Sequence, residues 1–142
     1  MTTATFAAAV ILNVSLLGAT PQDPARQAYD RSVQTGRPLV FLFGANWCPA
    51  CRVMKDRTLP VVEKNGGMRG VEYAYIDIDK RPDFAKRYLR GNSVPQLIRF
   101  DREGEKWKSQ YLIGAQSPER VTQFLATTKE GTPANYTNYS AQ

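Results

Sequence analysis

The sequence predicts a single α/β domain whose central mixed sheet is covered by helices on both faces. Runs of apolar residues of strand length alternate along the chain with segments that carry apolar residues at helical spacing. A helical segment joins the first two strands, which should therefore be parallel, whereas a short turn joins the last two, which should be antiparallel. With 142 residues, of which 42% are hydrophobic, the chain is long enough to enclose one core.

A helix and a buried strand open the domain. Asp23 is a suitable cap for a helix that has Pro24 at its first position, and the helical pattern ends at Gly36. Leu39–Phe43 is apolar throughout rather than alternating, which is typical of a central strand covered on both faces.

An interrupted helix and a second strand come next. A helix is expected over Cys48–Arg57, and Pro60 either breaks it or starts a second piece that reaches Lys64. After a glycine-containing loop, residues 71–79 form the second strand, with polar and apolar residues alternating in its second half.

The last part of the domain contains two helices and a hairpin. Pro82 opens a helix that ends at about Leu89. Two strands follow over Gln96–Phe100 and Trp107–Ile113, and the hairpin turn between them is expected at Asp101–Gly104. Ser117 then caps the last helix.

The two ends of the chain differ from the middle in composition. Phe6–Ala19 is apolar but too short to span a bilayer comfortably, and Gly18-Ala19-Thr20 offers small residues for cleavage, which favours a signal peptide. Met1–Thr5 lacks the usual positive charge, so an uncleaved anchor or a buried N-terminal element are alternatives. A signal peptide implies export, to the periplasm or the extracellular space, rather than a cytoplasmic location. The predicted divisions are a signal peptide or N-terminal anchor, a folded domain and a poorly ordered tail: 1–20, 21–130 and 131–142.

The chain is basic, with a net charge of +6 from 19 Lys and Arg against 13 Asp and Glu. The charge is densest at Lys80, Arg81, Lys86, Arg87 and Arg90. No nucleic-acid-binding motif accompanies this cluster, so a solvated helix face is the preferred interpretation and no nucleic-acid partner is expected. A basic surface also favours encounters with acidic partners.

The only two cysteines, Cys48 and Cys51, lie where the buried strand turns into a helix. A helix N-terminus carries unpaired N–H groups and the positive end of the helix dipole, which should lower the pKa of Cys48 and favour its reactive thiolate. Cys51 is one turn further on and close enough to form a disulfide with Cys48. A thiolate that attacks a disulfide and a neighbour that resolves the intermediate together form a complete redox unit.

Two other roles for the cysteine pair are open. A purely structural disulfide across two residues would close a very small loop and stabilise the fold little. A zinc site would need ligands from a second chain or from carboxylates, because the sequence has no histidine. We expect no metal and no cofactor.

Three short motifs resemble the thioredoxin family. Trp47–Cys51 matches its W-C-x-x-C motif, Ser93–Pro95 matches its loop ending in a cis-proline, and Gly114 falls where the family has a glycine after its last strand. The resemblance covers roughly Gln22–Thr128. It implies a thioredoxin-like fold with the usual first strand replaced or lost.

The resemblance also implies roles for individual residues. Cys48 would be the attacking thiolate and Cys51 the resolving thiol. Pro95 would be cis and lie against the pair, the Val94 backbone would pair with an extended substrate, and Trp47 would shield the site and contact substrate. The alternatives are an ordinary proline at the start of a strand and a tryptophan that only packs at a strand end.

The sequence departs from the family at the positions that handle the proton of the buried cysteine. Leu42 stands where many thioredoxins have a buried Asp, and Tyr75 stands where they have its Lys partner. Proton transfer would then rely on water or on another residue such as Asp77 or Glu63. Pro49-Ala50 replaces the usual Gly-Pro, which leaves the redox potential and direction open.

These observations predict a thiol–disulfide oxidoreductase that acts on protein disulfides and works with an unidentified redox partner. It resembles thioredoxin-like proteins of bacterial envelopes more than the cytosolic reductant. We expect a monomer without a stable membrane span. The alternatives are a non-catalytic protein-binding module with this fold and a cytosolic thioredoxin variant.

Overall fold

The computed structural model describes residues 23–126 and 139–140. The helices are α1 (Pro24–Thr35), α2 (Pro49–Val53), the π-helix η1 (Met54–Thr58), α3 (Leu59–Lys64), α4 (Pro82–Tyr88) and α5 (Pro118–Ala126). The strands are β1 (Leu39–Gly44), β2 (Glu72–Asp77), β3 (Gln96–Glu103), β4 (Lys106–Ile113) and β5 (Tyr139–Ser140). The expected leader lies outside the described residues, as does the expected tail apart from β5.

The sheet has the order β2-β1-β3-β4-β5. β1 pairs with β2 in parallel and with β3 antiparallel, and the β3–β4 pair is also antiparallel, which confirms the predicted mixed sheet. In the described part of the chain no strand precedes α1, so β2 is an edge strand.

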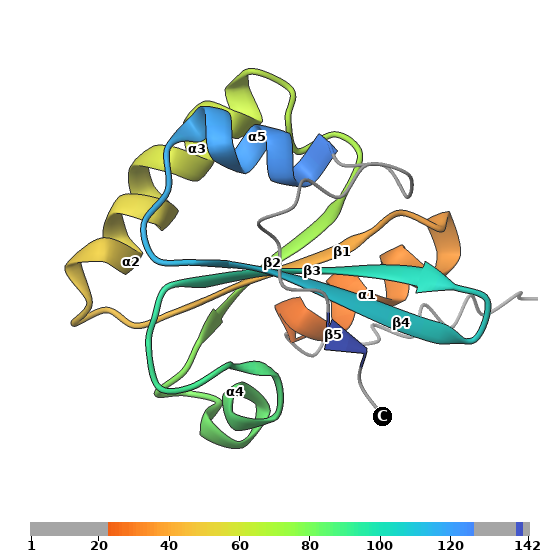
Figure 1. The fold of residues 1–142 in the computed structure, drawn as a ribbon, viewed down its shortest axis with the longest axis horizontal. Coiled ribbons are helices and arrows are strands. Elements are labelled where there is room, and N and C mark those ends of the chain that lie inside the picture. The colour runs from red at the N-terminus through yellow and green to blue at the C-terminus, as the bar shows by residue number, and fades with distance from the viewer. Residues whose placement is uncertain (1–22, 127–138, 141–142) are drawn as a thin grey trace, which may run out of the picture.

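Helices cover both faces of the sheet, as predicted. In Figure 1, α2, α3 and α5 lie on one side of the strands and α1 and α4 on the other. Consecutive side chains of β1 point in opposite directions. Val40 and Leu42 therefore join the core cluster beneath α3 and α5, whereas Leu39, Phe41 and Phe43 join the cluster beneath α1 and α4. β1 is buried over its whole length, as its unbroken apolar sequence predicts.

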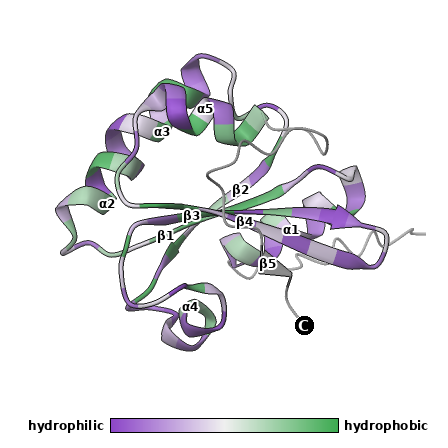
Figure 2. Cartoon of the chain, in the orientation of Figure 1, coloured by the Kyte–Doolittle hydropathy of each residue, from purple (hydrophilic) through white to green (hydrophobic). Residues whose placement is uncertain are grey.

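The hairpin turn lies later than predicted. β3 continues to Glu103, which pairs with Lys106, so the loop consists of Gly104 and Glu105 rather than Asp101–Gly104. Gly104 has a φ of 63°, the left-handed conformation that two-residue hairpin loops require. Figure 2 shows hydrophilic residues along this end of the hairpin, which extends beyond the helical layers.

The helix after the cysteine motif is not broken at Pro60: a second helical piece, α3, begins at Leu59 and reaches Lys64, which confirms the second of the two alternatives. Five residues, Met54–Thr58, form a π-helical turn, and the Leu59 N–H donates to the Met54 carbonyl. The wider turn adjusts the backbone just before Pro60, which lacks an N–H and takes a position at the start of α3. Among the described residues, no helix is both long enough and apolar enough to cross a bilayer.

Candidate functional site

The cysteine pair lies at the junction of β1 and α2, as the sequence predicts. Cys48 is the N-cap residue of α2, with φ −89° and ψ 111°, and Cys51 lies in the first turn of the helix. The two form a disulfide with a Cα–Cα distance of 5.2 Å. The Cys51 N–H donates to Cys48 Sγ at 3.1 Å, so a sulfur takes the place of the usual capping oxygen.

This capping arrangement suits a sulfur that becomes an anion. The N–H that points at Cys48 Sγ is one of the donors that a helix N-terminus leaves unpaired. Cys48 is 5% exposed and Cys51 1%, so the leading sulfur is the more accessible of the two. Among the residues described, no group of three or more His, Cys, Asp and Glu side chains could hold a metal ion.

The Val94–Pro95 loop lies directly against the disulfide. The Val94–Pro95 peptide bond is cis, as expected, and the Val94 carbonyl oxygen lies 3.7 Å from Cys48 Sγ. Pro95 is fully buried, and its carbonyl accepts a hydrogen bond of 2.8 Å from the Gly114 N–H. The predicted neighbours of the cysteine pair, Val94 and Pro95, are therefore held against it by the end of β4.

Gln96 positions this loop, and the sequence reasoning missed it. Its fully buried carboxamide accepts a hydrogen bond from the Arg90 N–H at 3.1 Å and donates to the carbonyls of Arg90 and Ser93, each at 2.7 Å. The available signal was a polar residue at the head of an apolar strand, next to Pro95. A buried amide must find partners, and here the partners are the backbone that leads into the cis peptide.

Trp47 projects from the end of β1 and is the most exposed large apolar side chain beside the disulfide, at 65% exposure. Its indole Nε1–H donates to Asp79 Oδ2 at 2.9 Å. Asp79 follows β2, and the carboxyl ends of two parallel strands lie at the same edge of a sheet. That rule was the signal that could have paired Asp79 with Trp47.

Gly44 and Tyr75 lie on the inner side of the pair, next to Cys51, and Leu42 precedes Gly44 by two residues on β1. Leu42 is fully buried, and Tyr75 lies beside it in the parallel register of β1 and β2. A Cβ atom on Gly44 would lie 3.1 Å from Cys51 Cβ and 3.2 Å from the Tyr75 hydroxyl oxygen, so this glycine lets the tyrosine pack next to Cys51. Burial raises the pKa of Tyr75, and the Asp77 carboxylate raises it further.

The two carboxylates considered for proton transfer, Asp77 and Glu63, lie on β2 and α3. Asp77 ends β2, and its Oδ1 accepts a hydrogen bond from the Asp79 N–H at 3.0 Å. Glu63 is on α3, where its charge acts on Tyr73 and contributes, after burial and Tyr75, to raising the pKa of that phenol.

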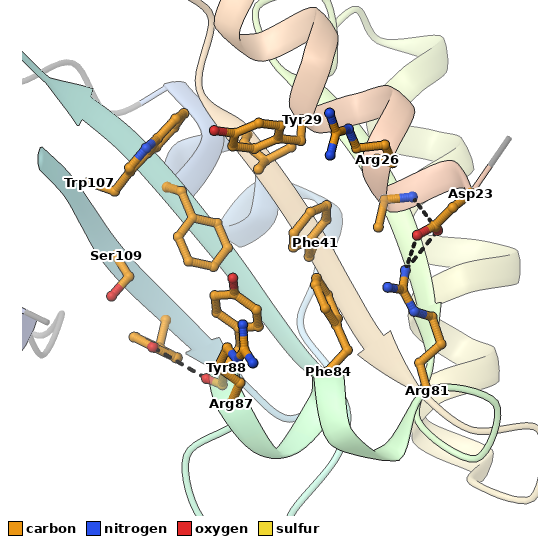
Figure 3. A pocket seen from close by; sticks show the side chains of 14 residues that line it. Asp23, Arg26, Tyr29, Phe41, Arg81, Phe84, Arg87, Tyr88, Trp107 and Ser109 are labelled. Carbon is orange, nitrogen blue, oxygen red and sulfur yellow. Dashed lines mark hydrogen bonds and ion pairs between the residues drawn. The ribbon is translucent and has the colours of Figure 1, made fainter. Parts of the chain in front are cut away.

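A pocket of about 720 Å³ lies on the face of the sheet covered by α1 and α4 (Figure 3). Aromatic side chains line it, and the Arg81–Asp23 ion pair, with an N–O distance of 2.6 Å, closes one end. None of the predicted site residues lines this pocket. The cysteine pair therefore lies after the end of β1 and outside this cavity.

Comparisons with known proteins agree with this geometry. A family model described as a thioredoxin-like domain matches residues 25–129. The mitochondrial thioredoxin of Bos taurus is 36% identical over 69 residues, which are 49% of this chain and 40% of that protein. Thioredoxin-2 of Pyricularia oryzae is 25% identical over 93 residues, 66% of this chain and 50% of that protein. The chain thus covers half or less of these relatives' length.

Solved structures share the fold at low sequence identity. A thioredoxin from Thermus thermophilus superposes with a TM-score of 0.63 at 20% identity, covering 72% of this chain and 81% of that one. Trichomonas vaginalis thioredoxin gives a TM-score of 0.58 at 22% identity, covering 73% and 96%. Because the family model spans the fold from the first helix through the last, this protein belongs to the family of thioredoxin-like domains.

Proposed function

We propose that this protein is a thiol–disulfide oxidoreductase that acts on protein disulfides through Cys48 and Cys51. The observation that carries the proposal is the disulfide at the start of α2, where the Cys51 N–H points at Cys48 Sγ. That donor stabilises negative charge on the sulfur that is nearer the surface, which is the requirement for an attacking thiolate.

The reaction transfers two electrons from the dithiol to a substrate disulfide. The Cys48 thiolate attacks one substrate sulfur, a Cys48–substrate disulfide forms, and the other substrate sulfur leaves as a thiolate that takes up a proton. Cys51 then loses its proton to solvent and attacks Cys48 Sγ. The Cys48–Cys51 bond forms, and the second substrate thiolate leaves and is protonated.

The substrate is a polypeptide bound in an extended conformation. The backbone of Val94 lies beside Cys48 Sγ and offers strand-like pairing next to the reacting sulfur. Trp47 directly precedes Cys48 in the sequence. Its indole N–H donates a hydrogen bond to Asp79, which fixes the ring, so the exposed ring adds an apolar surface for substrate.

The test is catalysed reduction of insulin disulfides by the purified protein. Cys48→Ser should reduce the rate to the uncatalysed background. Cys51→Ser should still attack but accumulate a mixed disulfide, visible as a covalent adduct under non-reducing conditions. Full activity in Cys48→Ser would show that the role assignment is wrong.

A non-catalytic binding module is the second candidate, and the strongly exposed Trp47 is the observation that favours it. A redox titration separates the two. An enzyme should show a reversible two-electron couple in the range of protein disulfide reductases. A disulfide that resists reductants of that range would favour the binding module.

We further propose that the protein acts outside the cytoplasm, in the periplasm or extracellular space. The support is the apolar stretch Phe6–Ala19, which is typical of a signal peptide. N-terminal sequencing of the mature protein tests this. A chain that begins near Thr20 or Pro21 agrees with export, and a chain in the cytosol that retains Met1 would point to a cytosolic variant.

A further inference from the structure

The residue next to Cys51 on the inner side of the disulfide is a tyrosine, and a glycine makes room for it. The point where a Gly44 Cβ would lie is 3.1 Å from Cys51 Cβ and 3.2 Å from both the hydroxyl oxygen and ring atom Cε2 of Tyr75. The phenol and the resolving cysteine thus flank the same small space at the end of β1. Any larger residue at Gly44 would separate them.

The hydroxyl of Tyr75 is suited to donate a hydrogen bond there. In the part of the chain that the structure describes, it has no hydrogen-bond partner, although Lys55 Nζ lies 4.6 Å from the ring centroid. Burial raises the pKa of this phenol, and the carboxylates of Asp77, Asp56 and Asp79 raise it further in that order. The phenol therefore keeps its proton at neutral pH and acts as a donor, not as a base.

We propose that the Tyr75 hydroxyl donates a hydrogen bond to the Cys51 thiolate when the disulfide is opened, directly or through one water, and thereby accelerates release of the bound substrate. Cys51 gives its proton to solvent, Tyr75 keeps its own, and the Cys51 thiolate then attacks Cys48 Sγ. This inference rests on the proposed function, because it concerns the resolving step of that reaction.

The environment of Cys51 makes such a donor important. Asp56, Asp77 and Asp79 are the carboxylates that act on Tyr75, so they add negative charge next to the space that Tyr75 shares with Cys51. Leu42, on the same strand as Gly44, supplies no polar group. The Cys51 N–H is already directed at Cys48 Sγ. A hydrogen bond to a charged group contributes more than one between neutral groups, so the phenol is the group placed to stabilise the Cys51 thiolate.

The first experiment measures ionisation of Cys51 without any substrate. The reduced protein is labelled with ¹³C at the cysteine Cβ, and both cysteine signals are followed by NMR as the pH is raised. The chain has two cysteines and no histidine, so side-chain titrations near neutral pH are few. Tyr75→Phe should shift the Cys51 midpoint upward by about one pH unit, which corresponds to a tenfold smaller acid dissociation constant of the Cys51 thiol.

The matched control is Tyr73→Phe. Tyr73 lies on the same strand and the same face as Tyr75 but is two residues further from the cysteine motif. Its removal should leave the Cys51 midpoint unchanged. An unchanged midpoint in Tyr75→Phe, or an equal shift in both variants, would overturn the proposal, because the first excludes the hydrogen bond and the second indicates a general effect of the strand.

The second experiment measures release of a preformed mixed disulfide between Cys48 and a peptide thiol. Release should be about tenfold slower at neutral pH in Tyr75→Phe, whereas the rate of the first attack by Cys48 should be unchanged. Equal release rates would contradict the role of Tyr75. If the unmodified protein forms no mixed disulfide at all, the proposed function fails, and the NMR titration still decides whether Tyr75 acts on Cys51.

Discussion

The two sides of the disulfide differ in how closely they follow the family pattern. On the outer side, Trp47 and Val94 occupy the positions that the W-C-x-x-C and cis-proline motifs predict, and the loop is held by buried hydrogen bonds. On the inner side, an aliphatic residue and a phenol, Leu42 and Tyr75, replace the expected charged pair. The comparison teaches that the residues around Cys48 can keep the family pattern while those beside Cys51 depart from it.

Burial explains why the inner side tolerates this change. Leu42 is fully enclosed by the core cluster, where an isolated carboxylate would lose its hydration. Tyr75 is only half-buried and stays neutral, so it costs little to place. A donor that is neutral at neutral pH can thus stand where a buried ion pair would need two matched partners.

The largest effect should come from restoring a carboxylate on the inner side. Leu42→Asp should lower the free energy of unfolding by roughly 3–5 kcal/mol at neutral pH, because the charge is buried without a partner. Urea titration measures this. Burial would raise the folded-state pKa of the new carboxyl, so part of the loss should be recovered as the pH falls from that raised pKa toward the unfolded value of about 4, below which no more is recovered.

The uncharged variant Leu42→Asn is the control for this prediction. It removes similar apolar contacts, so its free energy of unfolding should also be lowered. Because the amide does not ionise, that loss should not be recovered as the pH falls. If Leu42→Asp is as stable as the unmodified protein, the inner side is more hydrated than its burial indicates, and the contrast between the two sides is weaker than described.

The next largest effect on stability should come from removing the hydrogen bonds that hold the loop before Pro95 on the outer side. Gln96→Leu removes three hydrogen bonds to the loop before Val94 and should lower the free energy of unfolding by about 2–3 kcal/mol. Because the loop positions the Val94 carbonyl next to Cys48, insulin reduction should fall even under conditions where the variant is fully folded. Activity that tracks only the folded fraction would show that Gln96 supports the fold and not the substrate loop.

A smaller effect is expected at Trp47. Trp47→Ala should leave thermal stability nearly unchanged, because the ring is mostly exposed, but should raise KM for a protein substrate about fivefold with kcat unchanged. Asp79→Asn, which weakens the hydrogen bond to the indole, should also raise KM, but by a smaller factor. A change in kcat alone would place Trp47 in the chemical steps instead of substrate binding.

The smallest effect on stability at neutral pH should come from Tyr73→Phe, at a residue on the same face of β2 as Tyr75. Burial, then Tyr75 and Glu63, raise the pKa of Tyr73 above its ordinary value of 10.0. The unfolded chain therefore loses this proton first, so the stability that the neutral phenol contributes is fully present below pH 10.0 and is lost as the pH rises further. Tyr73→Phe should weaken this alkaline loss in urea titrations at several pH values.

Local pattern was sufficient for the order of helices and strands and for the place of the cysteine pair. The unbroken apolar sequence of β1 predicted its central position, and the pair Cys48–Cys51 fell at the end of that strand. The hairpin was misplaced because Asp101 is a good turn residue in isolation. The pairing of β3 with β4 instead continues to Glu103 and Lys106, so the turn falls at Gly104, a residue with positive φ.

Features that join distant segments depended on the tertiary structure. The contacts of Gln96 with the loop before Pro95, of Trp47 with Asp79 and of Tyr75 with the Gly44–Cys51 space each need a specific register between separate elements. The sequence by itself determined which residues could react, since the chemistry of a thiol at a helix start is local. Only the folded chain decided which groups surround those thiols, because packing across the sheet brings together residues that no local pattern relates.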